Sequence, residues 1–146
     1  MSEEQKLAVR AAIAALSDPV EDDDFWINGR PFFLSFGEDY EGEFACLADD
    51  GIPAVTGWTP ADAIGLGAMC NQPEDHRILG ELCVRFARMF DGLIDFSGTL
   101  DTMRSTPPAD ATPFYAIDTK AGFVWHLGGP KFLEWWLQQP EFRMVK

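Results

Sequence analysis

Apolar positions spaced three and four residues apart predict the longest helix of the chain over residues 73–90. The apolar face expected for this helix consists of Ile78, Leu79, Leu82, Cys83, Phe86 and Phe90. Asp91-Gly92 is a helix stop signal directly after it. A shorter helix is predicted over residues 131–138, because Gly-Gly-Pro precedes it and a proline ends it.

Two further helices are predicted from their start signals. Ser2 and Gln5 have the spacing of a capping box before a helix over about residues 3–16. Its apolar face is expected to consist of Val9, Ile13 and Leu16. A helix is also predicted over residues 59–70, because a threonine followed by a proline is a strong start signal. Two glycines inside it lower its propensity, so tight packing against a neighbour is expected.

Short runs of aromatic and β-branched residues between turn signals predict strands. Asn28-Gly29 is a strong hairpin signal between two such runs. The strands expected lie at residues 25–27, 32–36, 43–47, 54–56, 93–96, 114–117 and 123–127. Strands and helices follow one another in runs, which favours an α+β fold in a single domain, residues 1–146. We expect a mostly antiparallel sheet of about five to seven short strands with about four helices packed on it.

The composition is that of a folded cytoplasmic protein. The chain has 146 residues, 47% of them apolar and 12 of them Phe, which is enough for a core without disulfides or metal. No apolar run approaches the roughly 18 residues of a membrane helix, and the acidic amino terminus is not a secretory signal. Three cysteines, Cys46, Cys70 and Cys83, lack CxxC spacing and are expected to be reduced thiols.

Negative charge is concentrated in one segment. The net charge is −13, and residues 18–62 hold 12 acids and one base, Arg30. This acidity argues against direct binding of nucleic acid or anionic membranes. Two interpretations stay open: a solvated surface that maintains solubility, or a docking surface for a basic partner, with aromatic residues between the charges. The residues expected to contact such a partner are Asp22, Asp23, Asp24, Trp26, Glu38, Asp39, Tyr40, Glu41, Glu43, Asp49 and Asp50.

Catalytic and metal motifs are weak. The chain has two histidines and no GxSxG, Walker or GxGxxG motif, so no catalytic residue, cofactor or metal is expected. Residues 38–43 match the sequence pattern of a calcium-binding loop only in part. An alternative function, a small enzyme or ligand-binding domain, would require a set of titratable residues to converge in a pocket. That set is Asp75, His76, Asp91, Asp95 and His126.

Four motifs give the chain a resemblance to a known group of proteins. They are GWTP at residues 57–60, DHxILG at 75–80, FDGLIDF at 90–96 and FRMVK at 142–146. Together they resemble a family of small bacterial proteins that is associated with immunity proteins of polymorphic and contact-dependent toxin systems. The resemblance covers roughly residues 57–146 and leaves out the first 56 residues, which hold most of the negative charge.

The resemblance implies a binding function. An immunity protein binds a cognate protein toxin and neutralises it, and a toxin that acts on nucleic acid or nucleotides has a basic catalytic domain that an acidic segment complements. The resemblance implies no catalytic residues. Besides the enzyme alternative, an adaptor that forms its own oligomer remains possible, and it would present a large apolar patch across a twofold axis.

Overall fold

The computed structural model of the protein describes residues 1–17, 20–37, 52–59, 62–118, 122 and 124–144. The helices in these ranges are α1 (Glu3–Ala14), α3 (Ile52–Thr56), α4 (Pro73–Phe90) and α5 (Pro130–Trp136). The strands are β1 (Val20–Glu21), β2 (Asp24–Ile27), β3 (Arg30–Phe36), β4 (Ile64–Ala68), β5 (Ile94–Asp95), β6 (Phe114–Asp118) and β7 (Val124–Gly128).

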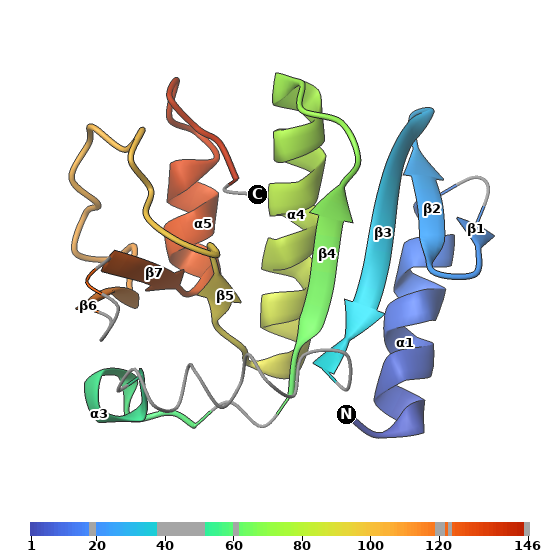
Figure 1. Cartoon of the computed structure of the whole chain (residues 1–146), viewed down its shortest axis with the longest axis horizontal. Helices are drawn as coiled ribbons and strands as arrows, with labels where there is room; N and C mark the ends of the chain where they lie inside the picture. Colours follow the sequence, from blue (N-terminus) through green and yellow to red (C-terminus); the bar gives the residue numbers. More distant parts are fainter. Residues whose placement is uncertain (18–19, 38–51, 60–61, 119–121, 123, 145–146) are drawn as a thin grey trace.

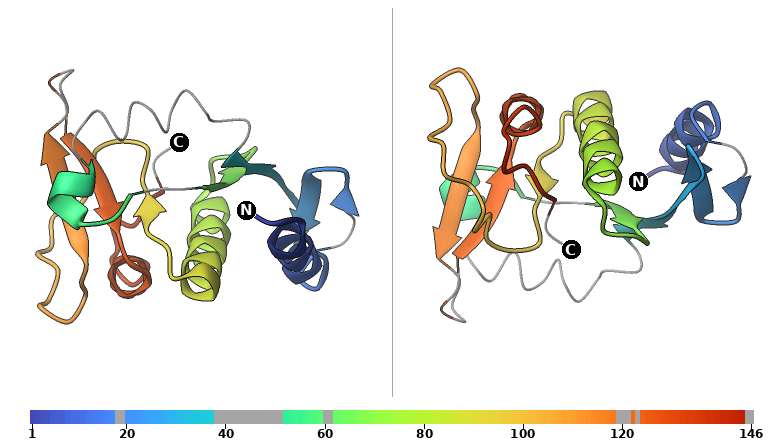
Figure 2. Two further views of the ribbon diagram at one scale, coloured as in Figure 1. Left: turned by 90° about the horizontal axis from the view of Figure 1, so that it is seen from below. Right: turned by 90° about the horizontal axis from the view of Figure 1, so that it is seen from above.

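The predicted α+β class is confirmed, and all strand pairs are antiparallel. The seven described strands form two sheets, of which the larger has the order β1-β2-β3-β4 and the smaller the order β5-β7-β6. The helices α1 and α4 lie behind the larger sheet (Figure 1). The views from below and above show α1, α4 and α5 side by side on the same side of the molecule (Figure 2).

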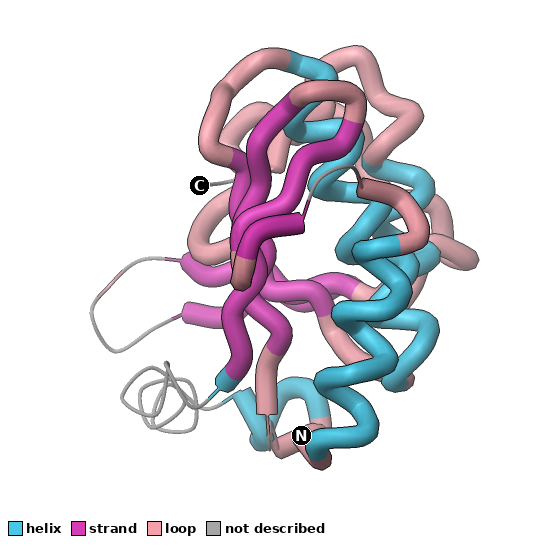
Figure 3. Tube along the Cα trace, turned by 90° about the vertical axis from the view of Figure 1, so that its right-hand side faces the viewer, coloured by secondary structure: helices cyan, strands magenta, loops and turns pink. Residues whose placement is uncertain are grey.

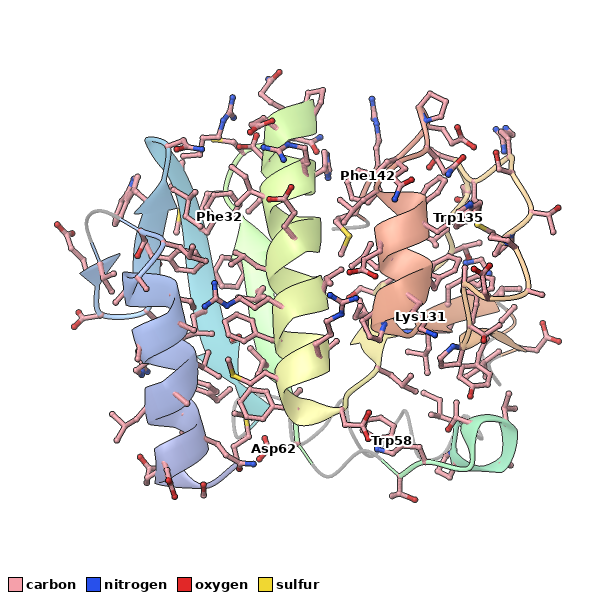
Figure 4. All side chains as sticks on the ribbon, turned by 180° about the vertical axis from the view of Figure 1, so that it is seen from behind. Phe32, Trp58, Asp62, Lys131, Trp135 and Phe142 are labelled. Atoms are coloured by element: carbon pink, nitrogen blue, oxygen red, sulfur yellow. The ribbon has the colours of Figure 1, made fainter. Side chains whose placement is uncertain are left out.

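The hairpin predicted at Asn28-Gly29 is confirmed. Both residues are left-handed, with φ of 54° and 73°, which is the geometry of a two-residue turn that matches the twist of the flanking strands. This turn sets the β2–β3 register, in which Phe25 lies opposite Phe32. Their rings stack at 5.6 Å in the main core, and Figure 4 shows Phe32 between β3 and α4.

The two helices predicted most strongly are confirmed. In α1 the capping box of Ser2 and Gln5 forms as expected, and Val9 and Ile13 are buried. Leu16 was expected on the same face, and this is wrong, because α1 ends at Ala14 and Leu16 is 46% exposed. The helix α4 ends where it was predicted to end, because Asp91 directly after its last residue has the left-handed conformation.

The helix predicted over residues 59–70 is wrong. Residues 64–68 form β4, which pairs with β3 along its whole length. Ile64, Leu66 and Ala68 alternate with two glycines and pack against the main core. Side chains that face the core thus recur at every second residue, which is the spacing of a strand and not of a helix. Pairing with β3 thus decided the conformation of a segment with little helix propensity.

Two smaller strand predictions have different outcomes. The strand expected at residues 54–56 is wrong, because these residues belong to the short helix α3. Ile52, at the start of α3, is buried against Ile117 and Leu127 in a second small cluster, which fixes the segment on the smaller sheet. The strand expected at residues 43–47 lies outside the described residues.

The carboxyl-terminal half follows the prediction more closely. The strands expected near residues 93–96, 114–117 and 123–127 correspond to β5, β6 and β7, and α5 covers most of residues 131–138. After α5 the chain turns back onto the core, where the Phe142 ring meets the Trp136 ring edge-on at 5.9 Å. Figure 4 shows Phe142 on the α4 side of this region and Trp135 on the other side of α5. Among the described residues, no helix has the length and apolar character needed to cross a bilayer.

Candidate functional site

The side of the larger sheet that faces away from α1 and α4 is called the outer face here. Because side chains alternate along a strand, directly paired residues point to the same face. The pairs Glu21–Asp24, Asp24–Phe33 and Phe33–Gly67 therefore form one row across all four strands. The pair Trp26–Pro31 forms a second row, and Met69 continues it, since its N–H donates to the Pro31 carbonyl. Figure 3 shows the strands from the side, with the long helices on one side only.

The inner face of the same strands holds the one base of the acidic segment. Arg30 pairs with Ile27 in the β2–β3 register and points inward, where its Nη1 lies 2.6 Å from Oδ1 of Asp75. Asp75 is fully buried at the start of α4 and also accepts a hydrogen bond of 2.6 Å from the Gln72 N–H. The positive charge of Arg30, whose side chain is 32% exposed, is thus paired on the inner face and does not neutralise the outer face.

The turn between β1 and β2 carries the acids closest to α1. Asp22 has a φ of 55°, and Asp23 Oδ1 lies 2.6 Å from Nη1 of Arg10 on α1. A groove of about 340 Å³ lies between this turn and α1, and it is lined by apolar side chains that include Leu7 and Val20. Asp23 therefore serves to hold the turn against α1 as well as to carry charge.

The structure describes four of the residues predicted to contact a partner. Asp24 and Trp26 share the outer face, Asp22 lies at the exposed turn, and Asp23 is turned toward Arg10. The other predicted contact residues lie outside the described residues, namely Glu38, Asp39, Tyr40, Glu41, Glu43, Asp49 and Asp50.

Sequence reasoning missed the apolar members of the outer face. Phe33 is 39% exposed and Met69 is 48% exposed, and neither was predicted as a site residue. The two-residue turn at Asn28-Gly29 is the signal that could have placed Phe33 opposite Asp24, because such a turn fixes the register of the hairpin. Met69 could not be placed, because it lies within residues 59–70, which were predicted as a helix.

The residues of the enzyme alternative do not converge. Asp75 and His76 are in the first turn of α4, whereas Asp91 follows its last residue. Sixteen residues of α-helix separate Asp75 from Asp91 by roughly 24 Å. Asp75 and Asp91 therefore do not share the single pocket that the enzyme alternative would require.

Asp75 has a structural environment. Burial is the largest influence on its pKa and opposes ionisation, but hydrogen bonds from the Gln72 N–H and from Arg30 outweigh it. The pKa of Asp75 therefore lies below its ordinary value. A carboxylate held ionised in this way is suited to anchoring Arg30 and the helix start, and it is a poor general acid.

The remaining two residues of that alternative lie on the smaller sheet and make different contacts. Asp95 Oδ1 accepts hydrogen bonds from the Ser97 N–H at 2.6 Å and from Trp125 Nε1 at 2.5 Å. His126, next to Trp125 on β7, points to the opposite face and its Nδ1 accepts from the Leu100 N–H at 2.8 Å. Burial lowers the pKa of His126, so the neutral ring is the form that holds Leu100.

A second groove of about 340 Å³ lies between the start of α4 and the carboxyl-terminal segment. His76 from the DHxILG motif and Phe142 and Arg143 from the FRMVK motif line it, so the fold brings together two segments that carried the sequence resemblance. Glu141 and Arg143 give the groove one acid and one base, so its charge selects neither an anion nor a cation.

The thiols and possible metal ligands complete the survey of reactive groups. Burial raises the pKa of the Cys83 thiol to about 12, which suppresses the nucleophilic thiolate. Cys70 is exposed, and Cys46 lies outside the described residues. In the part of the chain that the structure describes, no three His, Cys, Asp or Glu side chains are grouped closely enough to hold a metal ion.

Comparison with known proteins places the chain in one family. A family model described as a family of unknown function, DUF6368, matches residues 1–146. The search of curated proteins and the search of solved structures each returned no significant match.

Proposed function

Because the chain belongs to the DUF6368 family of unknown function, we propose its function from its own chemistry: it is an immunity protein that binds and neutralises a cognate bacterial toxin. Binding is through the acidic surface of residues 18–62, which blocks a basic active-site cleft of the toxin. The protein acts by occupancy and performs no catalysis.

The observation that carries this proposal is the inward position of Arg30. Arg30 is the one base among residues 18–62, and it is paired with the buried Asp75. Within the described residues, Glu21, Asp22 and Asp24 belong to no ion pair and lie at one edge of the larger sheet. Concentrating like charges without partners destabilises a protein, and a basic partner would offset that repulsion.

The separation of the titratable groups supports a binding function over the enzyme alternative. Asp75 is held ionised by its hydrogen bonds, and His126 is engaged with the Leu100 N–H. An acidic surface would also raise the rate of association with a basic toxin, which is useful when the toxin must be captured before it acts.

The test uses the product of the gene immediately upstream as the candidate toxin. Its carboxyl-terminal domain is expressed in a bacterial host with and without this chain, and growth is measured. We expect growth arrest by the upstream domain alone and rescue on co-expression, with a one-to-one complex after purification. Rescue without a complex, or no rescue by a stably expressed chain, would contradict the proposal.

The placement of the interface has its own matched variants. Glu21→Lys with Asp24→Lys reverses two carboxylates of the outer face, and Glu4→Lys with Asp110→Lys makes the same change in charge at exposed positions elsewhere. We expect the first pair to slow association at least tenfold and to flatten its salt dependence. The second pair should have a much smaller effect. Equal effects of the two pairs would mean that only net charge matters.

A further inference from the structure

We propose that the outer face of the larger sheet is the docking surface for an arginine-bearing segment of the partner protein, with Trp26 and Phe33 as the aromatic anchors. The arginine stacks on these rings while its guanidinium reaches the carboxylates of Glu21 and Asp24. This inference rests on the proposed function and adds to it the surface and the chemical group that is recognised.

The geometry of the outer face places charge directly beside an aromatic ring. Asp24 lies opposite Phe33 in the β2–β3 register, and Glu21 lies opposite Asp24 in the β1–β2 register. Directly opposite side chains have Cβ atoms about 5 Å apart, and neighbouring rows are within about 8 Å. Trp26, two residues from Asp24 on the same strand, therefore belongs to the same contact area.

Glycine in β4 makes room for this arrangement. A Cβ atom placed on Gly67 would lie only 2.0 Å from Cε1 of Phe33, so the ring occupies the space directly over the Gly67 backbone. Phe33 keeps 39% of its surface exposed there, beside the 48% exposed Met69. Large apolar side chains that stay exposed in a cluster with a polar rim are typical of interaction sites.

The charges of the outer face determine the partner's chemistry. The Arg30 charge is used on the inner face and Asp23 is paired with Arg10, whereas Glu21 and Asp24 belong to no ion pair within the described residues. A guanidinium can stack on an aromatic ring and also donate two hydrogen bonds to a carboxylate, which an ammonium cannot do. Arginine therefore fits this row better than lysine.

The same charges argue against the other occupants of an exposed sheet face. A second copy of this chain carries the same acidic outer face, and none of the described residues on that face is a base, so face-to-face pairing would leave Glu21 and Asp24 without a cation. Nucleic acid and anionic lipid would be repelled by these carboxylates. A basic protein surface is the occupant that the carboxylates attract.

The experiment measures the Kd for the purified carboxyl-terminal domain of the upstream gene product by calorimetry. The test variant is Trp26→Ser with Phe33→Ser, and Gly67→Ala is a second variant that displaces the Phe33 ring without removing it. The control is Leu7→Ser with Val55→Ser, two apolar residues at least half exposed that lie outside the outer face. Thermal melts confirm that each variant is folded.

We expect the test variant to bind about 30-fold to 100-fold more weakly, as for aromatic anchors at other interfaces. Gly67→Ala should weaken binding by a smaller factor, and the control should bind within about threefold of wild type. If the wild type binds and both outer-face variants bind as tightly as it does, this inference is overturned and the proposed function still stands. If the wild type itself does not bind, the proposed function fails, and this inference fails with it.

Discussion

Arg30 Nη1 and Asp75 Oδ1 lie 2.6 Å apart, and this ion pair joins the start of β3 to the first turn of α4. Asp75 also accepts from the Gln72 N–H, so one buried carboxylate serves as a helix cap and as an anchor for the hairpin. The two residues are 45 positions apart in the chain. Because the pair uses the one base of residues 18–62, the described strand residues place no base on the outer face.

Arg30→Ala should destabilise the protein strongly. Removing Arg30 leaves the buried Asp75 without its cation. Because the Arg30 side chain is itself 32% exposed and Asp75 keeps the hydrogen bond from the Gln72 N–H, we expect a cost of about 2 kcal/mol. The free energy of unfolding from urea titrations measures this effect. The matched control is Arg77→Ala, which breaks the exposed pairs of Arg77 with Glu74 and Glu81 and should cost at most about 1 kcal/mol. Equal costs for the two variants would contradict the structural importance of the Arg30–Asp75 pair.

Ionisation of Asp75 should make the free energy of unfolding depend on pH in the acidic range. Its pKa in the folded protein lies below the ordinary value of 3.8, so the unfolded chain binds the proton more readily. The resulting stabilisation is fully present above the ordinary pKa and is lost as the pH falls through the pKa of the folded state. Asp75→Asn should therefore flatten the acid limb of the stability curve, measured by thermal melts at pH values from about 5 to about 2. An unchanged acid limb would contradict the assignment.

His126 should produce a second pH dependence at a higher pH. Burial lowers its pKa in the folded state below the ordinary value of 6.5, and its neutral Nδ1 accepts from the Leu100 N–H. The unfolded chain therefore binds more protons between the two pKa values, and stability should be full above about pH 6.5 and fall as the pH is lowered. His126→Asn retains an acceptor near the Nδ1 position and cannot titrate. Its stability should change less than that of the wild type between about pH 7 and about pH 5.

Truncation after Pro140 should lower the melting temperature sharply. The deleted segment includes Phe142, which packs on Trp136, and Met144, which is 5% exposed. Burial of two such side chains contributes on the order of 1.5–3 kcal/mol each, and about 1 kcal/mol corresponds to roughly 2–4 °C in a protein of this size. We therefore expect a decrease of about 10 °C or more.

The control for this truncation is Arg143→Ala in the full chain. Arg143 has an exposed side chain, and its backbone carbonyl, which accepts from Trp136 Nε1 at 3.3 Å, is kept in this variant. Its melting temperature should stay within about 2 °C of the wild type. A truncated protein that melts like the full chain and loses only partner binding would place the segment in the interface instead of the core.

The sequence by itself determined the elements whose signals are local. The spacing of Ser2 and Gln5 predicted a capping box that forms as expected, and the apolar positions of residues 73–90 predicted α4 with its end at Asp91. Asn28-Gly29 determined the β2–β3 hairpin, because few other residues adopt two successive left-handed conformations. Charge was also readable from the sequence, since it depends on composition alone.

Tertiary structure decided the elements and contacts that depend on distant partners. Residues 64–68 became a strand because β3 offered them a complete set of backbone partners, and local propensity for a helix was too weak to compete. The inward position of Arg30 depends on Asp75, and the exposed position of Phe33 depends on the space over Gly67. No local pattern encodes these contacts, because each joins residues at least 28 positions apart, and only the folded chain brings them together.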